Sequence, residues 1–340
     1  MSAVGAALER IVGGINLSRE QAEGALNEIL GGEVDPIQIA GFLVALRTKG
    51  ETADEIAGMA AAVRRAATPV TSARGPLVDS CGSGGGPSTF NISTAVAIVA
   101  AGAGAPMAKH GNRSVTSACG SADVLEALGV RVDLTAEAVG QCLDEVGLAF
   151  MFAPNHHPAF RHVGPVRKAL GVRTIFNLLG PLANPAGAPR QVIGVFDPAY
   201  LDRIGEALAV LGTEHALVVA ARDGMDEIST TTQTDAIEVI DGAPRRLVID
   251  PLEYGIAPAP PGSLAGGDPA ANAETIRAIL AGAPGAPRDI VILNAAAVLW
   301  LSGLASDISD GLGVATQSID SGLAAETLDN LVSTTQRLAL

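Results

Sequence analysis

Between residues 76 and 220, short apolar segments that predict strands alternate with segments that predict helices. A strand followed by a helix and another strand implies parallel pairing, because the connection has to cross one face of the sheet. Aromatic residues are only 3% of the chain, so the core must consist mainly of Ala, Val, Leu and Ile, as suits helices packed on a buried parallel sheet. The predicted strands are residues 76–80, 106–109, 148–152, 192–196 and 216–220, and the predicted helices are residues 91–103, 121–128, 136–146 and 204–211.

The first seventy residues contain helix signals and no strand signal. Each of three predicted helices starts at a polar residue that can cap free backbone N–H groups, with Gln or Glu three residues later. These signals are Ser18 with Gln21, Asp35-Pro36 with Gln38, and Thr52 with Glu55, at the starts of helices near residues 22–30, 36–47 and 54–66. The fold class is therefore α/β, with a small all-helical N-terminal domain (1–72) and a large domain (73–340) whose mainly parallel central sheet is covered by helices. Within the large domain, residues 256–267 are expected to form a surface loop and residues 290–301 a buried helix.

A glycine-rich turn follows the first predicted strand and precedes a helix. Glycines let backbone N–H groups approach a phosphate, and a helix start adds free donors and the positive end of the helix dipole. The turn is not a P-loop, because no Gly-Lys-Ser/Thr follows, and Pro87 stands where a dinucleotide fingerprint would have its third glycine. A plain flexible turn would show the same glycines, but the polar residues after them favour anion binding. The glycines are Gly82, Gly84, Gly85 and Gly86, and the polar residues are Asn91, Ser93 and Thr94.

Two further segments carry positive charge. Lys109 and Arg113 follow a predicted strand, where the carboxyl end of the sheet faces the ligand crevice, and could contact phosphate as a point charge and as a fork. Residues 151–174 contain four basic residues and no acidic one, which favours binding of an anion such as a carboxylate. The histidines of this region are better explained as lining a loop or substrate site than as metal ligands, because no paired acid or cysteine spacing accompanies them.

An acidic pair, Asp226 and Glu227, follows the predicted strand at residues 216–220. Hard oxygen ligands near phosphates are the usual way of binding Mg²⁺, although an acidic dipeptide in a loop is more often simply solvated.

Four of these segments, with others, resemble the anthranilate phosphoribosyltransferase family, which has the nucleoside phosphorylase/phosphoribosyltransferase class III fold. The resemblance lies in TFNIST at residues 89–94, KHGNR at 109–113, GSADVLEALG at 120–129, RTIFNLLGPL at 173–182, and the pairs His157-Pro158, Asn184-Pro185 and Asp226-Glu227. It implies a helical domain completed by helices from about residues 160–185 and a homodimer formed through the small domains. It also implies transfer of the phosphoribosyl group from 5-phosphoribosyl 1-pyrophosphate (PRPP) to the amine of anthranilate, a step of tryptophan synthesis that uses Mg²⁺.

By position, the resemblance implies a role for individual residues of this chain. PRPP would be held by Gly82, Gly84, Gly85, Thr89, Asn91, Ser93, Thr94 and Lys109. Anthranilate would contact Gly82, His110, Asn112, Arg167, Gly180 and Pro181, with Arg167 as the partner of its carboxylate. Mg²⁺ would be held by Ser93, Asp226 and Glu227, and Lys109, Asn112 and Arg167 would be the catalytic residues.

The glycine-rich turn departs from the family pattern. The family's turn usually reads Gly-Thr-Gly-Gly-Asp-Gly, whereas this chain has Gly-Ser-Gly-Gly-Gly-Pro, is one residue shorter before Asn91 and has no counterpart of the aspartate. The departure puts one contact to the ribose–pyrophosphate region in question.

Charge and composition weigh against other classes of protein. The net charge of −14 disfavours nucleic acid or an anionic membrane as partner, and therefore a non-catalytic nucleic-acid-binding relative. A paralogue with another acceptor remains the alternative enzyme, disfavoured by the Asn112 and Arg167 pair. Three scattered cysteines and no leader pattern in residues 1–20 predict a cytoplasmic protein. Nothing in the sequence indicates whether a glutamine amidotransferase associates with it.

Overall fold

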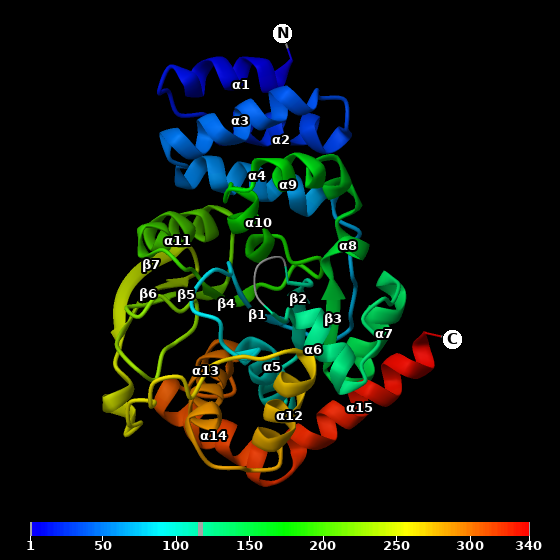
Figure 1. Ribbon diagram of the computed structural model, residues 1–340, viewed down its shortest axis with the longest axis vertical. Helices are drawn as coiled ribbons and strands as arrows, with labels where there is room; N and C mark the ends of the chain where they lie inside the picture. Colours follow the sequence, from blue (N-terminus) through cyan, green and yellow to red (C-terminus); the bar gives the residue numbers. More distant parts are fainter. Residues whose placement is uncertain (1, 115–117, 340) are drawn as a thin grey trace.

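The computed structural model describes residues 2–114 and 118–339. Helices of the N-terminal segment lie at one end of the molecule, and the sheet with its covering helices forms the rest (Figure 1). The segment has four helices: α1 (Ala3–Val12), α2 (Arg19–Gly31), α3 (Pro36–Lys49) and α4 (Ala53–Ala66). Helix α1 was not predicted, because no capping box with its later Gln or Glu precedes it; Ser2 caps it alone by accepting from the Gly5 N–H.

Two of the three predicted capping boxes are formed. The Ser18 and Gln21 pair and the Thr52 and Glu55 pair each exchange side-chain and backbone hydrogen bonds at the starts of α2 and α4. At α3 the prediction was wrong in part, since Asp35 accepts from the backbone N–H of Ile37 and Gln38 takes no part in the cap. Each cap satisfies backbone donors that helix ends otherwise leave free, which is why these short motifs locate the helices so closely.

The central sheet has seven strands in the order β3-β2-β1-β4-β5-β6-β7. Its first five strands in this order are parallel, β6 pairs antiparallel with β5, and β7 pairs antiparallel with β6. The predicted parallel core is confirmed, whereas β6 and β7 were missed. The strands are β1 (Val78–Gly82), β2 (Met107–Gly111), β3 (Leu148–Phe152), β4 (Arg190–Gly194), β5 (His215–Ala221), β6 (Thr234–Ile240) and β7 (Ala243–Ile249).

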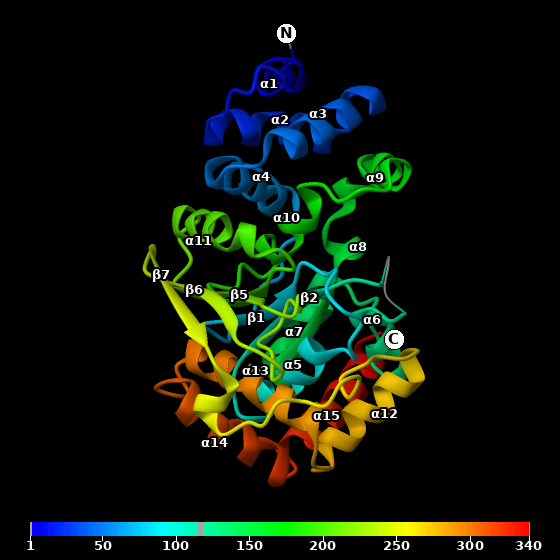
Figure 2. The ribbon, with the colours of Figure 1, turned by 60° about the vertical axis from the view of Figure 1, so that its left-hand side comes forward.

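Helices cover both faces of the sheet. One face carries α5 (Ile92–Gly102), α13 (Ala286–Ser302), α14 (Ile308–Asp320) and α15 (Leu323–Leu338), while α11 (Leu201–Val210) lies on the other face, between the sheet and α4 (Figure 2). Residues 290–301 form part of α13 and are almost entirely buried, as predicted. The remaining helices are α6 (Ser121–Leu128), α7 (Ala136–Val146), α8 (Ala153–His156), α9 (Gly164–Leu170), α10 (Phe176–Leu182) and α12 (Pro269–Leu280).

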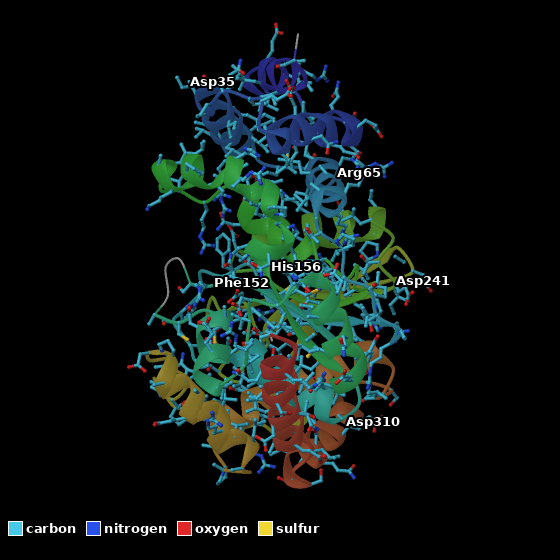
Figure 3. The ribbon with its side chains drawn as sticks, turned by 90° about the vertical axis from the view of Figure 1, so that its right-hand side faces the viewer. Asp35, Arg65, Phe152, His156, Asp241 and Asp310 are labelled. Atoms are coloured by element: carbon cyan, nitrogen blue, oxygen red, sulfur yellow. The ribbon has the colours of Figure 1, made fainter. Side chains whose placement is uncertain are left out.

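The apolar core forms two clusters. One packs α5, α13 and their neighbours against one face of the sheet, and includes Val96 and Leu299. The other runs from Phe42 and Leu43 of the N-terminal helices through α10 and α11 to Val218 on the opposite face. Phe152 and His156 mark the place where the chain leaves β3 towards the N-terminal helices (Figure 3). No helix in the described part of the chain combines the length and the apolar character that crossing a bilayer requires.

Candidate active site

The glycine-rich turn lies at the carboxyl end of β1, where β1 is flanked by β2 and β4. Gly84 and Gly85 have φ angles of +68° and +102°, a region that side-chain-bearing residues rarely adopt. The backbone N–H of Gly84 donates to Oδ2 of Asp226 over 2.7 Å. A Cβ atom on Gly82 would clash with the same oxygen, so glycine is required there for Asp226 to reach the turn. The turn therefore presents a backbone donor that already holds an anionic group.

The polar residues at the start of α5 differ in how far they are engaged. Asn91 donates to the carbonyl of Cys119 over 3.2 Å, and its own side-chain oxygen accepts from Asn272 over 2.9 Å. Thr94 is buried, and its hydroxyl has no hydrogen-bond partner among the residues that the structure describes. Thr89 pairs with Ala265 in an isolated β-bridge beside the turn. Asn91 is thus fixed in orientation, while Thr94 keeps a free hydroxyl.

Lys109 is buried in the middle of β2, and its side chain reaches β1 and α5. Its Nζ atom donates to the carbonyl of Ser80 over 2.8 Å and to the hydroxyl of Ser93 over 3.2 Å. Burial lowers the pKa of Lys109, and the negative charge of Asp79 opposes that shift. Asp79 is itself buried and accepts from Asn184 over 2.8 Å and from the backbone N–H of His110 over 3.2 Å. Asp79 therefore supplies a partial counter-charge near Lys109, against the burial that raises its own pKa.

The acidic pair follows β5 and faces the same space. Burial raises the pKa of Glu227 to about 8, with further contributions from the charge of Asp226, which raises it, and of Lys109, which lowers it. Burial also raises the pKa of Asp226, against the Gly84 N–H and the charge of Arg173. Asn294 of α13 holds the next residue, Ile228, by accepting from its N–H over 2.9 Å and donating to its carbonyl over 2.8 Å. Two carboxylates are thus held close together by a rigid helix, at the cost of mutual repulsion.

A row of rings runs from the sheet towards the N-terminal helices. The rings of His110 and His157 have centroids 5.1 Å apart, His157 stacks on Phe160 at 5.1 Å, and Phe160 meets Phe176 edge-on at 5.3 Å. The guanidinium carbon of Arg167, on α9, lies 5.3 Å from the centroid of Phe176. The row therefore leads from the end of β2 to a cationic side chain.

Both histidines of the row are neutral. Burial lowers the pKa of His110 to about 3 and that of His157 to about 4. The Nδ1 atom of His110 lies 3.3 Å from the carbonyl oxygen of Gly180, and Pro181 follows in α10. Within the described ranges, the Nε2 atoms of both rings are buried without a hydrogen-bond partner. Such unpaired buried atoms are costly unless a ligand satisfies them.

In the loop after β2, the neighbouring residues Asn112 and Arg113 have different surroundings. Asn112 is exposed; its side-chain oxygen accepts from the N–H of Arg113, and its carbonyl accepts from Ser121. Arg113 was expected to offer a fork to phosphate, and that expectation was wrong. Its guanidinium donates two hydrogen bonds to the carboxylate of Glu126, over 2.6 and 2.7 Å, and a third to Asp123. Helix α6 brings these two carboxylates to it. The ion pairs compensate the charge of Arg113 and turn it away from a ligand role.

Sequence reasoning assigned no role to four residues that hold this site together, although Asn184 belongs to one of the pairs that carry the family resemblance. Asp79 stands directly before the turn in a buried strand, a signal that could have been read as a counter-charge for a nearby cation. Asn184, Asn272 and Asn294 act through contacts far along the chain, which no local pattern reveals.

Oxygen donors suited to Mg²⁺ are present, although a complete protein cage is absent. Among the described residues, no group of three or more His, Cys, Asp or Glu side chains could hold a metal ion. Asp226 and Glu227 nevertheless bring together two carboxyl groups whose pKa values burial raises, so that a bound cation would stabilise their charged forms. Mg²⁺ commonly takes one or two carboxylates together with substrate phosphates. The donor set therefore fits Mg²⁺ bound with a phosphorylated ligand.

Family models match nearly the whole chain. Residues 6–67 match the glycosyl transferase family helical bundle domain, and residues 74–325 match the glycosyl transferase family a/b domain. An anthranilate phosphoribosyltransferase of Methanocorpusculum labreanum is 50% identical over 327 residues, which cover 96% of this chain and 96% of that protein.

Solved structures of the same kind are also similar. The crystal structure of the anthranilate phosphoribosyltransferase of Thermus thermophilus is 43% identical, with a TM-score of 0.92 and coverage of 97% of this chain and 99% of the other. The Saccharomyces cerevisiae enzyme in complex with PRPP and Mg is 26% identical, with a TM-score of 0.90 and coverage of 98% of each chain. The same yeast enzyme has been solved with 4-fluoroanthranilate.

Proposed function

The chain belongs to the anthranilate phosphoribosyltransferase family, and we propose that it transfers the phosphoribosyl group of PRPP to the amine of anthranilate and releases pyrophosphate. In this reaction the bond from ribose C1 to the pyrophosphate oxygen breaks, a C1–N bond forms, and the amine loses a proton. The observation that carries the proposal is the convergence of the glycine-rich turn, buried Lys109 and the acidic pair at one end of the sheet.

PRPP would bind between the glycine-rich turn and the start of α5. The free hydroxyl of Thr94 and the amide that Asn272 orients on Asn91 supply donors and acceptors there. Lys109 adds a positive charge next to Ser93. The residues proposed to hold PRPP are Gly82, Gly84, Gly85, Thr89, Asn91, Ser93, Thr94 and Lys109.

Asp226 and Glu227 would hold Mg²⁺, with the hydroxyl of Ser93 beside them. The bound ion would neutralise charge on the pyrophosphate leaving group. Lys109 contributes to the same end, because its Nζ atom is already fixed on Ser93. The structure of the yeast relative with PRPP and Mg supports this pairing of metal and substrate.

Anthranilate would lie along the row of rings. The Nε2 atoms of His110 and His157 offer unsatisfied polar groups, and Gly180 and Pro181 line the same wall through the contact of Gly180 with His110. Arg167 would pair with the carboxylate, since its burial lowers its pKa and no ion pair in the described part of the chain engages it. The residues proposed for anthranilate are Gly82, His110, Asn112, Arg167, Gly180 and Pro181.

Positioning and electrostatics would supply most of the rate. The ribose C1 centre becomes positively charged as pyrophosphate leaves, and the aromatic amine attacks it from the opposite face. The amine is already a nucleophile, so a strong general base is not required. Lys109, Asn112 and Arg167 act by stabilising charge and aligning the two substrates, which are effects that enzymes commonly use to lower barriers.

We further infer the domain organisation that the resemblance implied. The 3₁₀ helix Pro158–His162 contacts α2, α9 contacts α3, and α10 contacts α4. These contacts support a small domain of residues 1–72 completed by helices from about residues 160–185, beside a large α/β domain of residues 73–340.

A homodimer formed through the small domains is proposed as well. Four large apolar side chains on or beside α1 and α3 are exposed: Val12 (72%), Ile15 (50%), Ile37 (81%) and Val44 (43%). A second copy of the chain is the partner that such a face fits, because identical faces can meet across a two-fold axis.

Anthranilate fluorescence tests the activity. The protein is mixed with anthranilate, PRPP and Mg²⁺, and we expect the fluorescence of anthranilate to fall only when all are present. Mixtures without PRPP or without Mg²⁺ are the controls. Unchanged fluorescence in the complete mixture would favour a paralogue that uses another acceptor.

A further inference from the structure

Arg173 contacts the glycine-rich turn at the backbone carbonyl group of Gly84. Its Nη1 atom donates to the carbonyl of Gly84 over 2.9 Å, while Asp226 takes the N–H of the same residue. The guanidinium carbon lies 3.8 Å from the centroid of the Phe196 ring, just beyond β4. The guanidinium is therefore held flat on an aromatic ring, against the turn.

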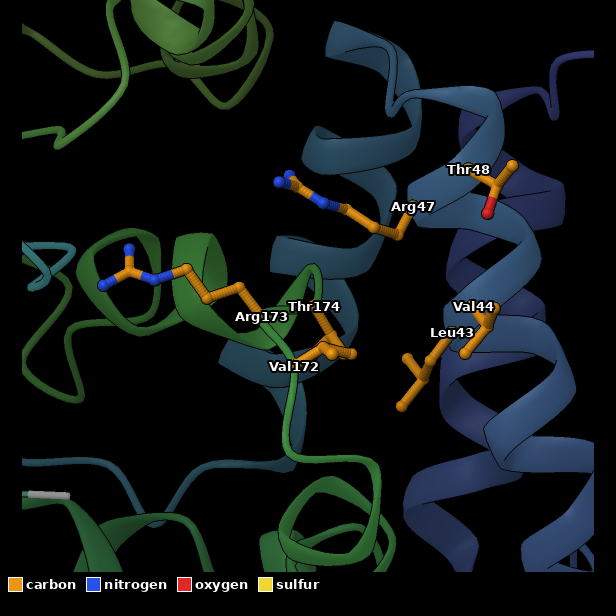
Figure 4. A pocket seen from close by; sticks show the side chains of 7 residues that line it. All are labelled: Leu43, Val44, Arg47, Thr48, Val172, Arg173 and Thr174. Atoms are coloured by element: carbon orange, nitrogen blue, oxygen red, sulfur yellow. The ribbon is translucent and has the colours of Figure 1, made fainter. Parts of the chain in front are cut away.

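Gly85 makes room for this contact. A Cβ atom built on Gly85 would overlap Nη2 of Arg173, so no side chain could stand there. Arg173 belongs to residues 172–174, which line a cavity of about 350 Å³ with α3. Its side chain extends away from Leu43 and Val44 (Figure 4). The absence of a side chain on Gly85 thus lets the guanidinium of Arg173 lie against the turn.

The positive charge of Arg173 is offset only in part, by the charge of the nearby Asp226. Within residues 2–114 and 118–339, its guanidinium forms no ion pair, and the bond to Gly84 leaves several of its N–H groups unused. The turn itself, residues 82–88, contains no acidic residue. Arg113 shows the contrast, because Glu126 and Asp123 occupy its guanidinium.

We propose that Arg173 is a further substrate-binding residue, which donates to the pyrophosphate group of PRPP while it holds the glycine-rich turn in place. This inference rests on the function proposed above and deepens it. A guanidinium is suited to the role because its N–H groups form a rigid fork that matches phosphate oxygens. Stacking on Phe196 fixes the fork beforehand, so that little side-chain freedom is lost when the anion binds. In this chain the turn itself contributes no acidic side chain, so Asp226 is the carboxylate that competes with a ligand for the charge of Arg173.

Calorimetric titration with magnesium pyrophosphate, the product, tests the proposal without turnover. Arg173→Gln should weaken binding by roughly 10- to 100-fold, as expected for loss of charge-assisted hydrogen bonds. Arg173→Lys, which keeps the charge but not the fork, should fall between. The matched control is Arg203→Gln, because Arg203 lies over the ring of Tyr200, 5.6 Å from its centroid, rather than on the turn. That control should bind like the unchanged protein.

Steady-state kinetics supplies the second readout. The KM for PRPP should rise with the pyrophosphate dissociation constant in Arg173→Gln, and the KM for anthranilate should stay within about threefold. Unchanged pyrophosphate affinity, or equal rises in both KM values, would overturn the proposal and leave a structural role only. If Arg173→Gln fails to fold, the Arg173→Lys variant replaces it, and a pyrophosphate affinity equal to that of the unchanged protein would again overturn the proposal. Absence of anthranilate turnover in the unchanged protein would instead contradict the proposed function. The pyrophosphate titration would still show whether Arg173 binds pyrophosphate.

Discussion

Oδ2 of Asp226 lies 2.7 Å from the backbone nitrogen of Gly84, so that a carboxylate from the loop after β5 caps the turn after β1. The N–H that would serve a phosphate is thus taken by a carboxylate that would serve a metal ion. The turn and the acidic pair are therefore linked before any substrate arrives.

Replacement of Asp226 by Asn separates its charge from its hydrogen bond. The Asn oxygen can still accept from Gly84, whereas the negative charge for Mg²⁺ is lost. We expect kcat to fall by roughly 100-fold and the Mg²⁺ concentration for half-maximal activity to rise, because metal charge stabilises the leaving group. Asp223→Asn is the control, since Asp223 in the same loop bonds to Ser229 instead. Similar losses in the two variants would show that only loop structure had been disturbed.

Arg167→Ala should raise the KM for anthranilate about 10- to 100-fold, because an ion pair with the substrate carboxylate is lost. The KM for PRPP should change little, as Arg167 lies over Phe176 at the far end of the row of rings. Initial rates with each substrate varied in turn measure both constants. Lys168→Ala removes a neighbouring exposed cation as the control. An equal effect on both KM values would contradict the assigned role.

Metal binding should depend on pH because Glu227 has a pKa raised to about 8. Its carboxyl group is protonated below that pH and must lose the proton before it can bind a cation. Affinity should therefore rise as pH increases from 6.5 to about 8 and level off above that pH, by up to about tenfold per pH unit on the rising part. Mn²⁺ binding followed by electron paramagnetic resonance measures this directly. Glu227→Gln should flatten the profile, and a profile equally steep in that variant would argue against Glu227.

Acid should destabilise the fold through His110 and His157. Their folded-state pKa values of about 3 and about 4 lie below the usual value of 6.5, so the unfolded chain binds protons that the folded chain excludes. The stability from these neutral rings is present above pH 6.5 and is lost as pH falls towards 4, on the order of 3 kcal/mol for each ring. Urea unfolding at several pH values tests this. His157→Gln should reduce the slope, and an unaltered slope would show that other groups control it.

Ile37→Asp should disrupt the proposed homodimer. Ile37 is 81% exposed on α3, and a charge at the centre of an apolar interface would remain without a partner. Light scattering coupled to gel filtration should show a dimer for the unchanged chain and a monomer for this variant. Leu252→Asp, which places the same charge on a residue 63% exposed outside α1 and α3, should stay dimeric. A monomeric unchanged chain would refute the assembly.

Local signals explain why much of the fold could be predicted. The cap at Ser18 and the closing glycine Gly129 mark helix ends by their own chemistry, and α6 and α7 have the predicted bounds. The antiparallel strands β6 and β7 were missed, since no helix separates them and β7 is mostly exposed at the edge of the sheet.

In the candidate site, too, local features could be predicted and long-range contacts could not. Its chemical groups follow their strands and could be found from the sequence, but the partners that orient them could not. Asn272 lies 181 residues from Asn91, and Asn294 lies 66 residues from Ile228. Arg113 was misjudged for the same reason, because its compensating carboxylate, Glu126, is placed by the path of α6.

The apolar cluster that runs from the N-terminal helices through α11 to the sheet has a consequence for cooperativity. Leu208 of α11 and Val218 of β5 belong to the same continuous cluster as Phe42 of α3. Detaching the N-terminal helices would expose apolar side chains of α11, and with them part of one face of the sheet, to solvent. We therefore expect the two parts of the chain to unfold in one transition, and the contacts proposed to align anthranilate with PRPP to be lost in that same transition.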